Sequence, residues 1–189
     1  MKQNLKIAIL MTVVTTVLLG IIYPLIVTGL AQAMFHDKAN GQLISRNGAV
    51  IGSRIIGQTF TGPEYFHSRP SAAGTGYDAA NSAGTNLGPT NKVLINRVRQ
   101  DASALQAENP SQPVPVDLVT TSASGLDPDI SIAAANFQVP RVARARGMTE
   151  AQLQQLVDAY TTGRQLGFLG EPRVNVLELN LALDQAKAH

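Results

Sequence analysis

The stretch that decides the fold runs from Ile7 to Leu30 and reads IAILMTVVTTVLLGIIYPLIVTGL. It lies within Ile7–Phe35, a segment that has no charged side chain, and it follows Lys2 and Lys6. As a helix that rises about 1.5 Å per residue, this stretch would extend roughly 36 Å, which is enough to cross a bilayer with some tilt. The sequence therefore predicts a membrane protein.

Two alternatives to a permanent membrane anchor are a cleaved signal peptide and a buried core helix. Residues 31–33 read AQA, an A-x-A sequence like that at a signal cleavage site. The apolar region of a signal peptide is about 7 to 15 residues long, however, and this run is longer. A core helix in so small a soluble protein would be shorter as well. We therefore expect an uncleaved transmembrane helix at residues 7–35, after an N-terminus at residues 1–6.

The orientation of the anchor depends on a small difference in charge. Lys2, Lys6 and the amino terminus precede the helix, whereas only Lys38 and Arg46 follow it closely. Positive charge favours the cytoplasmic side, and a following domain of about 150 residues tends to translocate whatever its charge. We expect a single-pass protein with a cytoplasmic N-terminus and with residues 36–189 outside, which in a bacterium is the periplasm.

The anchor contains residues that a lone apolar helix does not need. Pro24 removes one backbone hydrogen bond and favours a kink. Thr16 and Gly20 are four residues apart, a small-xxx-small pair that lets a neighbouring helix approach closely. Glycine, proline and back-bonded threonine are also common in membrane helices that have no partner. We favour packing against a partner subunit, with Thr16, Gly20 and Pro24 as candidate contacts.

The composition excludes several classes of function. The chain of 189 residues has no cysteine, which removes disulfides, lipidation at cysteine, thiol catalysis and thiolate metal sites. Its formal net charge is only +2, it has no Trp, and aromatic residues make up 5% of it. A nucleic-acid partner would require a dense basic stripe with stacking aromatic residues, so we expect none.

The remainder of the chain predicts an α+β fold, in which one N-terminal transmembrane helix is followed by a single mixed α/β extramembrane domain. Gly48–Gly57 is expected to form a strand or hairpin that begins the core. Helices are expected over four ranges: Asn91–Glu108, Ser131–Ala145, Thr149 to near Gly163, and Val174–Lys187.

These four helices differ in how clearly the sequence indicates them. Pro140 lies inside the second range and predicts a kink or two short helices. Thr149 and Gln152 form a capping-box pair that predicts the start of the third helix. The leucines of Val174–Lys187 alternate as in a strand, but Asn175 followed by Glu178 resembles a helix cap, and we choose a helix.

Two segments are expected to lack regular structure. Pro70–Asn91 is rich in Gly, Ala, Ser, Thr and Asn and has a single charge, Asp78. Loops of this length in a compact domain are often functional, so we expect this one to lie on another protein, with a mobile surface loop as the alternative. Asn109–Asp117 contains three prolines and predicts an extended connection.

The common catalytic and metal-binding patterns are absent from the sequence. There is no G-x-S-x-G sequence, and no serine is followed three residues later by lysine. The three histidines, His36, His67 and His189, are isolated from one another in sequence, so we expect no metal site. These absences disfavour acyl-enzyme chemistry and metal-dependent hydrolysis.

Two patterns resemble phosphate sites only in part. Gly52, Gly57 and Thr59 match the P-loop spacing, but Gln58 stands where the phosphate-binding lysine should be. A neutral amide cannot supply that attraction, so we interpret the match as accidental. Arg141, Arg144 and Arg146 could clamp a phosphate, although a solvated helix face is the more ordinary explanation.

Two further clusters are long and unusual. Tyr65–Ser71 reads YFHSRPS, and Ser122–Pro128 reads SASGLDP within a turn-rich segment, Thr120–Ser131. Gly125 permits positive φ, and Asp129 or Ser131 could cap the following helix. Together with VNVLELNLAL at residues 174–183, these motifs resemble the C subunit of the Kdp-type potassium-transporting P-type ATPase, from the anchor almost to the C-terminus.

This resemblance implies a non-catalytic accessory subunit of a bacterial inner-membrane complex that imports K⁺ at the expense of ATP. The implied partners are a K⁺-binding channel-like subunit, an ATP-hydrolysing P-type subunit and membrane lipid. The resemblance also implies a role in assembling or stabilising the complex, and in raising the nucleotide affinity of the hydrolytic subunit. No cofactor is expected on this chain, and ATP would be involved only through the complex.

A periplasmic domain cannot touch cytoplasmic ATP, so an effect on nucleotide affinity would have to be allosteric. The outer domain could instead cover the entrance of the K⁺ pathway and gate K⁺ entry. Residues 65–91 are then the expected partner contact, because aromatic residues and arginine are favoured at interfaces. The candidate contacts are Tyr65, Phe66, Arg69, Pro70 and Ser71. The alternative function is a free-standing, membrane-anchored binding or hydrolytic domain.

Overall fold

The computed structural model describes residues 1–186 and divides the chain into two compact units, 1–51 and 52–189. Residues 36–51, which we assigned to the extramembrane domain, fall in the first unit. Two sequence predictions extend past residue 186: the end of the last helix at Lys187, and the isolated histidine His189. Both lie outside the described residues.

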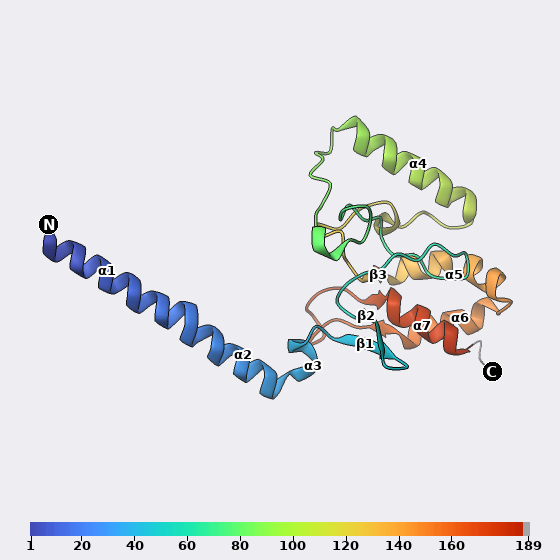
Figure 1. Ribbon diagram of the computed structural model, residues 1–189. Helices are drawn as coiled ribbons and strands as arrows, with labels where there is room; N and C mark the ends of the chain where they lie inside the picture. The colour runs from blue at the N-terminus through green and yellow to red at the C-terminus, as the bar shows by residue number, and fades with distance from the viewer. Residues whose placement is uncertain (187–189) are drawn as a thin grey trace. The chain divides into compact units, whose positions relative to one another are not determined.

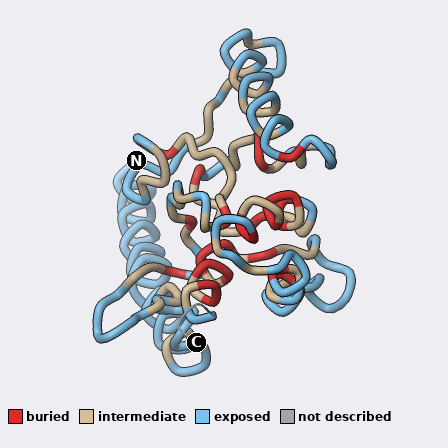
Figure 2. Tube along the Cα trace, turned by 90° about the vertical axis from the view of Figure 1, so that its right-hand side faces the viewer, coloured by how far each residue is buried: buried red, intermediate tan, exposed pale blue. Residues whose placement is uncertain are grey.

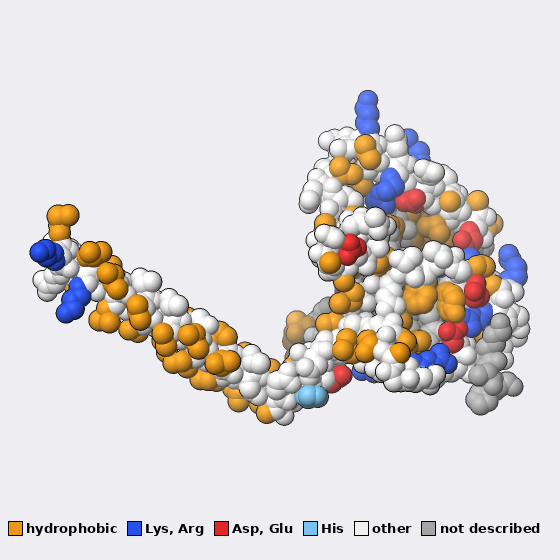
Figure 3. Space-filling model, viewed as in Figure 1, with side chains coloured by type: hydrophobic (Ala, Val, Ile, Leu, Met, Phe, Trp, Pro, Cys, Tyr) orange, Lys and Arg blue, Asp and Glu red, His pale blue; other side chains and the backbone are white. Residues whose placement is uncertain are grey.

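The apolar segment forms one long helical stretch from Lys2 to Met34. It consists of α1 (Lys2–Val17), a π-helical turn (Leu18–Ile22) and α2 (Tyr23–Met34). None of its apolar window is buried against the rest of the chain, and orange side chains cover its surface in Figure 3. By length and composition this helix can cross a membrane, as the sequence predicted.

The irregularity that we predicted at Pro24 takes the form of the π-helical turn just before it. Proline has no N–H to donate to the carbonyl four residues earlier, which here is that of Gly20, inside the π turn. Two threonines bond back to their own helix: Thr12 Oγ1 donates to the Ala8 carbonyl at 2.9 Å, and Thr15 Oγ1 donates to the Met11 carbonyl at 2.7 Å.

A short helix and a β-hairpin follow the anchor. They are α3 (His36–Ala39), β1 (Leu43–Arg46) and β2 (Ala49–Ser53). Asn47 and Gly48 both have positive φ, 52° and 81°, which is the geometry of a two-residue type I′ turn. A strand or hairpin was predicted over Gly48–Gly57, and the observed hairpin starts and ends earlier, at Leu43 and Ser53. It was wrong to expect the core to begin here, since Val50 is 60% exposed and Ile55 is 52% exposed.

The second unit contains two short 3-10 turns, η2 and η3, besides its helices and strands. In chain order its elements are η2 (Ala79–Asn81), α4 (Lys92–Glu108), η3 (Val116–Leu118), β3 (Asp129–Ser131), α5 (Ile132–Arg146), α6 (Glu150–Ala159), β4 (Thr161–Thr162), β5 (Arg173–Asn175) and α7 (Val176–Ala186). The mixture of helices and strands confirms the predicted α+β class.

The core of the second unit lies where α5, α6 and α7 meet a small sheet. The three strands are antiparallel in the order β3-β5-β4, and Ile130 and Thr161 both pair with Val174. The buried residues in Figure 2 gather on these helices and strands. Helix α4, at the top of Figure 1, has no buried residue, but its Leu105 packs against this core. Phe137, Leu153 and Leu179 are at most 1% exposed.

Helix α5 continues through Pro140 without interruption, so the alternative of two short helices was wrong, and a kink at Pro140 stays a prediction. An interior proline costs about 3 kcal/mol because it removes a hydrogen bond and crowds the preceding turn. Phe137 and Val142, on either side of it, are at most 1% exposed, and each such side chain contributes about 1.5–3 kcal/mol on burial. Packing therefore offsets the local penalty.

The helix starts follow the sequence closely. Asn91 caps α4, Ser131 caps α5, and Thr149 and Gln152 form the expected capping box of α6. The Oδ1 atom of Asn175 accepts from the Glu178 N–H at 3.1 Å and so closes the first turn of α7. The predicted end of α6 near Gly163 was too late, because the helix ends at Ala159 and the chain then enters β4.

Residues 70–91 pack on their own domain. Ala73 is fully buried, the Ala83 N–H donates to the Ser124 carbonyl at 3.0 Å, and Ser82 Oγ donates to the same carbonyl at 2.9 Å. Gly125 has φ of +67°, and a Cβ added there would lie 2.7 Å from Ala73 N. The turn of residues 122–128 thus holds the loop in place. Gly125 adopts the positive φ that glycine permits there.

Candidate functional site

The YFHSRPS segment enters the core in extended form and finds its hydrogen-bond partners on side chains. Phe66 is fully buried, and Asn180 of α7 accepts from its N–H and donates to its carbonyl, both at 2.9 Å. Gln138 of α5 does the same for His67, accepting at 2.7 Å and donating at 3.1 Å. Buried backbone groups need partners, so these two amides substitute for a neighbouring strand.

Arg146 is buried beside this segment and bonds to backbone and carboxylate. Its side chain is 3% exposed, and its guanidinium donates to the Glu64 carbonyl at 2.7 Å and to Asp184 at 2.9 Å. It also lies 4.8 Å from the centre of the Tyr65 ring, in a cation–π arrangement. Tyr65 in turn donates its hydroxyl to Asp184 at 3.2 Å.

Arg141 makes similar contacts one turn earlier on α5. It donates to the carbonyls of Pro63 and Tyr65 at 2.6 and 2.9 Å, and it forms an ion pair with Glu108 of α4 at 2.8 Å. The hypothesis that Arg141, Arg144 and Arg146 clamp a phosphate was therefore wrong. Arg141 and Arg146 bond to groups of their own domain, and only Arg144 is exposed. The alternative of a solvated helix face was wrong for the same two residues.

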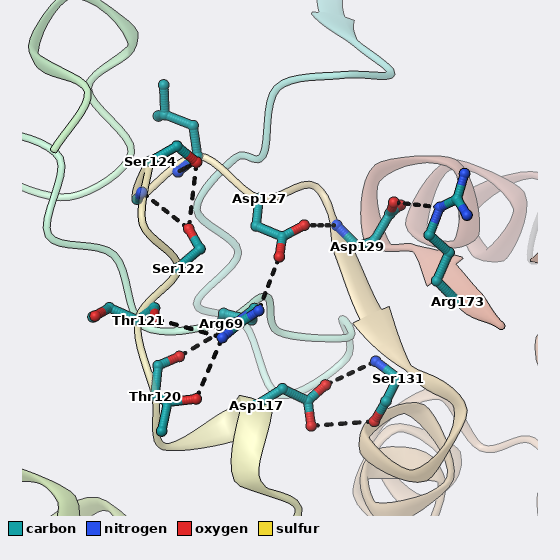
Figure 4. A network of polar contacts seen from close by, with 12 residues as sticks. Arg69, Asp117, Thr120, Thr121, Ser122, Ser124, Asp127, Asp129, Ser131 and Arg173 are labelled. Atoms are coloured by element: carbon teal, nitrogen blue, oxygen red, sulfur yellow. Dashed lines mark hydrogen bonds and ion pairs between the residues drawn. The ribbon is translucent and has the colours of Figure 1, made fainter. Parts of the chain in front are cut away.

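Arg69 joins the same segment to the turn of residues 120–127, as Figure 4 shows. It forms an ion pair with Asp127 at 3.0 Å and donates to Thr120, to the carbonyl and to Oγ1, at 3.3 Å each. Asp127 Oδ1 accepts from the Asp129 N–H at 3.1 Å. Asp129 pairs with Arg173 of β5 at 2.9 Å, so the network extends to the sheet.

Burial changes the acid–base properties of two groups near this network. Desolvation raises the pKa of Asp129 above its ordinary value, although Arg173 and Asn175 act in the opposite direction. Desolvation, together with the positive charge of Arg141, lowers the pKa of His67. His67 is therefore held neutral, and its Nε2 lies 2.9 Å from the Gly62 carbonyl.

Two clefts flank the segment. One of about 430 Å³ lies beside Arg69, Ser71 and Tyr77, and one of about 310 Å³ lies between His67 and α4. Ser71 is fully engaged, since Oγ donates to the Gly125 carbonyl at 2.6 Å and accepts from the Tyr77 N–H at 2.8 Å. Within residues 1–186 no three metal-ligating side chains gather at one place. Neither cleft therefore holds an assembled metal centre among these residues.

The structure places the candidate partner contacts in two groups. Thr16, Gly20 and Pro24 are exposed on the anchor helix. Tyr65, Arg69, Pro70 and Ser71 are half-buried, whereas Phe66 belongs to the core. Contact of any of them with a partner stays a prediction, and within this chain Phe66 serves to hold the segment in place.

The segment 52–59 does not form a phosphate-binding loop. Gly52 lies in β2, which ends at Ser53; Ser53 and Ile56 form an isolated bridge, and residues 60–78 contain no helix. A Cβ at Gly52 would lie 2.3 Å from the Gln58 amide, so Gln58 folds back on the turn. This geometry agrees with interpreting the P-loop match as accidental.

Comparison with known proteins identifies the family of the chain. The family model described as KdpC, K⁺-transporting ATPase, c chain, matches residues 5–185. The chain belongs to the KdpC family. The potassium-transporting ATPase KdpC subunit of Koribacter versatilis is 72% identical over 97% of this chain and 95% of its own length. The subunit of the same name from Acidobacterium capsulatum is 60% identical over 97% and 98%, respectively.

Membership of the KdpC family confirms the resemblance that the motifs indicated. It makes the chain a membrane-associated, non-catalytic subunit of a potassium-transporting ATPase complex. The match begins at residue 5 and so covers the whole apolar segment, Ile7–Phe35. The residues that sequence reasoning missed are Gln138 and Asn180, polar side chains placed among buried apolar neighbours of α5 and α7.

Proposed function

We propose that the chain is the accessory subunit that assembles and stabilises the potassium-transporting complex. The observation that carries this proposal is the helix from Lys2 to Met34, which buries none of its apolar window in its own chain. Such a surface needs lipid or other membrane helices around it. The anchor packs against a K⁺-binding channel-like subunit or an ATP-hydrolysing P-type subunit of the same inner-membrane complex.

The second unit lies on the outer side of the membrane in this proposal. Lys2 and Lys6 then face the cytoplasm, in agreement with the positive-inside tendency. From the outside, the domain can stabilise one transport state or cover the entrance of the K⁺ pathway. Any effect on the nucleotide affinity of the hydrolytic subunit is then allosteric, because it depends on unequal contacts with two states of the complex.

The side of the membrane can be measured directly because the chain has no cysteine. Ala107, exposed near the end of α4, is replaced by Cys and labelled in intact cells with an impermeant thiol reagent. Gln3→Cys, before the apolar segment, is the matched control. We expect labelling at 107 without lysis and labelling at 3 only after lysis. The reverse pattern would place the domain in the cytoplasm and restore direct contact with ATP.

Assembly is tested with the whole complex. Cells that lack this chain should lose growth at low external K⁺, and the remaining subunits should no longer co-purify from detergent-solubilised membranes. Adding back the full chain should restore both. Co-purification and K⁺ uptake that persist without the chain would exclude an assembly role and favour a free-standing anchored domain.

A further inference from the structure

The connection between β4 and β5 is a protruding loop with an apolar tip. We define residues 164–171 as the apolar finger; in Figure 1 it belongs to the reddish-brown stretch before α7. Leu166 is 83% exposed, Phe168 69% and Leu169 47%. Exposed large apolar side chains that cluster in this way mark interaction sites more often than scattered single ones do.

The apolar finger is closed by its own bonds. Gln165 and Leu169 exchange both backbone hydrogen bonds, each at 2.9 Å. Leu166 and Gly167 at the tip have positive φ, 53° and 83°. A left-handed conformation is uncommon for leucine, and the Leu166 side chain is exposed in this conformation. The tip is therefore pre-organised, which lowers the entropy lost when it binds.

The charges of the finger are neutralised within the domain. Arg164 pairs with Glu171 at 2.6 Å, and Arg173, just after the finger, pairs with Asp129 at 2.9 Å. There is no lysine between residues 150 and 186, and the finger has no Trp or Tyr. Binding to a lipid surface relies on free cations and interfacial aromatic rings, so this composition favours an apolar pocket on a protein.

The base of the apolar finger borders a cleft on the body of the domain. Glu171 and Pro172 at the base, and Val116, which is 71% exposed, line this cleft of about 490 Å³. The lining also includes Asp129 and Arg173, so polar and charged groups lie behind the apolar tip. An aromatic residue at the tip with polar surface behind it fits an interface with a central anchor and a polar contact around it.

We propose that the apolar finger inserts into an uncharged, apolar pocket of another subunit of the potassium-transporting complex, with Leu166 and Phe168 as its anchors. This inference rests on the proposed function, because it requires that the chain be assembled with such a subunit. It assigns a docking element outside the membrane anchor and outside the YFHSRPS segment.

The test is photo-crosslinking in the assembled complex. A photoreactive phenylalanine analogue is placed at position 168 of the full chain, and at position 93 as a control, since Val93 on α4 is equally apolar and 66% exposed. We expect a covalent adduct with another subunit from position 168 and none from position 93. If the wild-type chain co-purifies with the complex but position 168 gives no such adduct, the finger proposal fails and the proposed function stands. If the wild-type chain does not co-purify at all, the proposed function itself fails.

Two variants measure the contribution of the tip. Leu166→Asn removes the apolar side chain and keeps a residue that tolerates positive φ, and Phe168→Ser removes the aromatic ring. The double variant should bind the other subunits at least roughly 30-fold more weakly, because a central anchor of the interface is lost. Val93→Ser should bind as the wild type does. Unfolding curves of the purified full-length variants should coincide with that of the wild type, and unchanged binding by the double variant would overturn the proposal.

Lipid is tested as the other occupant. The chain has no tryptophan, so Phe168→Trp supplies the single tryptophan of the full chain, which is reconstituted into vesicles without other subunits. We expect no quenching of its emission by brominated lipids. Strong quenching would show that the tip enters the bilayer and would overturn the assignment to a protein pocket.

Discussion

Asn180 on α7 pairs with the backbone of Phe66 in both directions, since its side-chain oxygen accepts from the Phe66 N–H and its side-chain nitrogen donates to the Phe66 carbonyl, each at 2.9 Å. Asn180 is 1% exposed and Phe66 is 0% exposed. The contact joins parts of the chain 114 residues apart. It allows an extended segment to cross an apolar core without leaving its backbone groups unpaired.

Replacing Asn180 by Leu should destabilise the domain strongly. Both backbone groups of Phe66 would stay buried without partners, and each such group costs about 1–3 kcal/mol. Denaturant unfolding of the purified full chain in detergent measures the loss. Gln155→Leu is the matched control, because it removes an exposed amide from α6. Equal stability of the two variants would contradict the role of Asn180.

Arg146 and Arg144 make a second matched pair on one helix. Arg146→Leu removes the donors to the Glu64 carbonyl and to Asp184, whereas Arg144 is exposed. We expect the free energy of unfolding to fall by about 3 kcal/mol in Arg146→Leu. In Arg144→Leu it should change by no more than about 0.5 kcal/mol. Both values come from the same unfolding measurement. A large loss of stability for Arg144→Leu with none for Arg146→Leu would mean that Arg146 is not bound as described.

Stability should fall on acidification because of His67. Its pKa is lowered in the folded state by burial and by Arg141, against smaller opposing effects of Gly62, Glu108 and Glu64. As the pH falls below about 6.5, the unfolded chain therefore binds a proton at His67 before the folded chain does. The contribution of His67 to the free energy of unfolding is fully present above that pH, and it is lost as the pH falls through the folded-state pKa.

The comparison of His67→Gln with wild type isolates this effect. Unfolding free energy measured from pH 7.5 to 5 should decline less steeply in the variant. His36→Gln, which changes an exposed imidazole beside the anchor, is measured alongside as the matched substitution. A variant at position 67 with an unchanged slope would assign the pH dependence to other groups.

Gly20 tests whether the anchor packs against another membrane helix. A Cβ at this position would meet its nearest atom, Cγ2 of Thr16, at 3.9 Å, so the chain itself has room for a larger side chain. We expect Gly20→Ile to reduce co-purification with the other subunits several-fold, because a close helix approach tolerates only small residues. Gly29→Ile, where an added Cβ would meet no atom within 4 Å, should have little effect. Equal recovery of both variants would indicate that lipid surrounds Gly20.

Local chemistry explains which features the sequence predicts correctly. The apolar anchor depends on composition, and the capping box at Thr149 and the cap at Asn175 depend on residues within one turn of each other. Asn47 and Gly48 are an equally local signal for a hairpin turn. The hairpin that they form starts at Leu43, earlier than the range from Gly48 that we expected. Such interactions are complete within a few residues, so a single chain segment contains them.

The family motifs and the membrane segment are thus determined by the sequence itself, whereas the roles of the buried polar residues are decided only by the tertiary structure. Pro140 is tolerated because burial on both sides outweighs its local cost. Arg146 turns inward because the Glu64 carbonyl and Asp184 meet it there. Gln138 pairs with His67 across 71 residues of chain. Partners so distant in sequence leave no periodic pattern, because the free energy of each contact depends on a neighbour that only the folded chain provides.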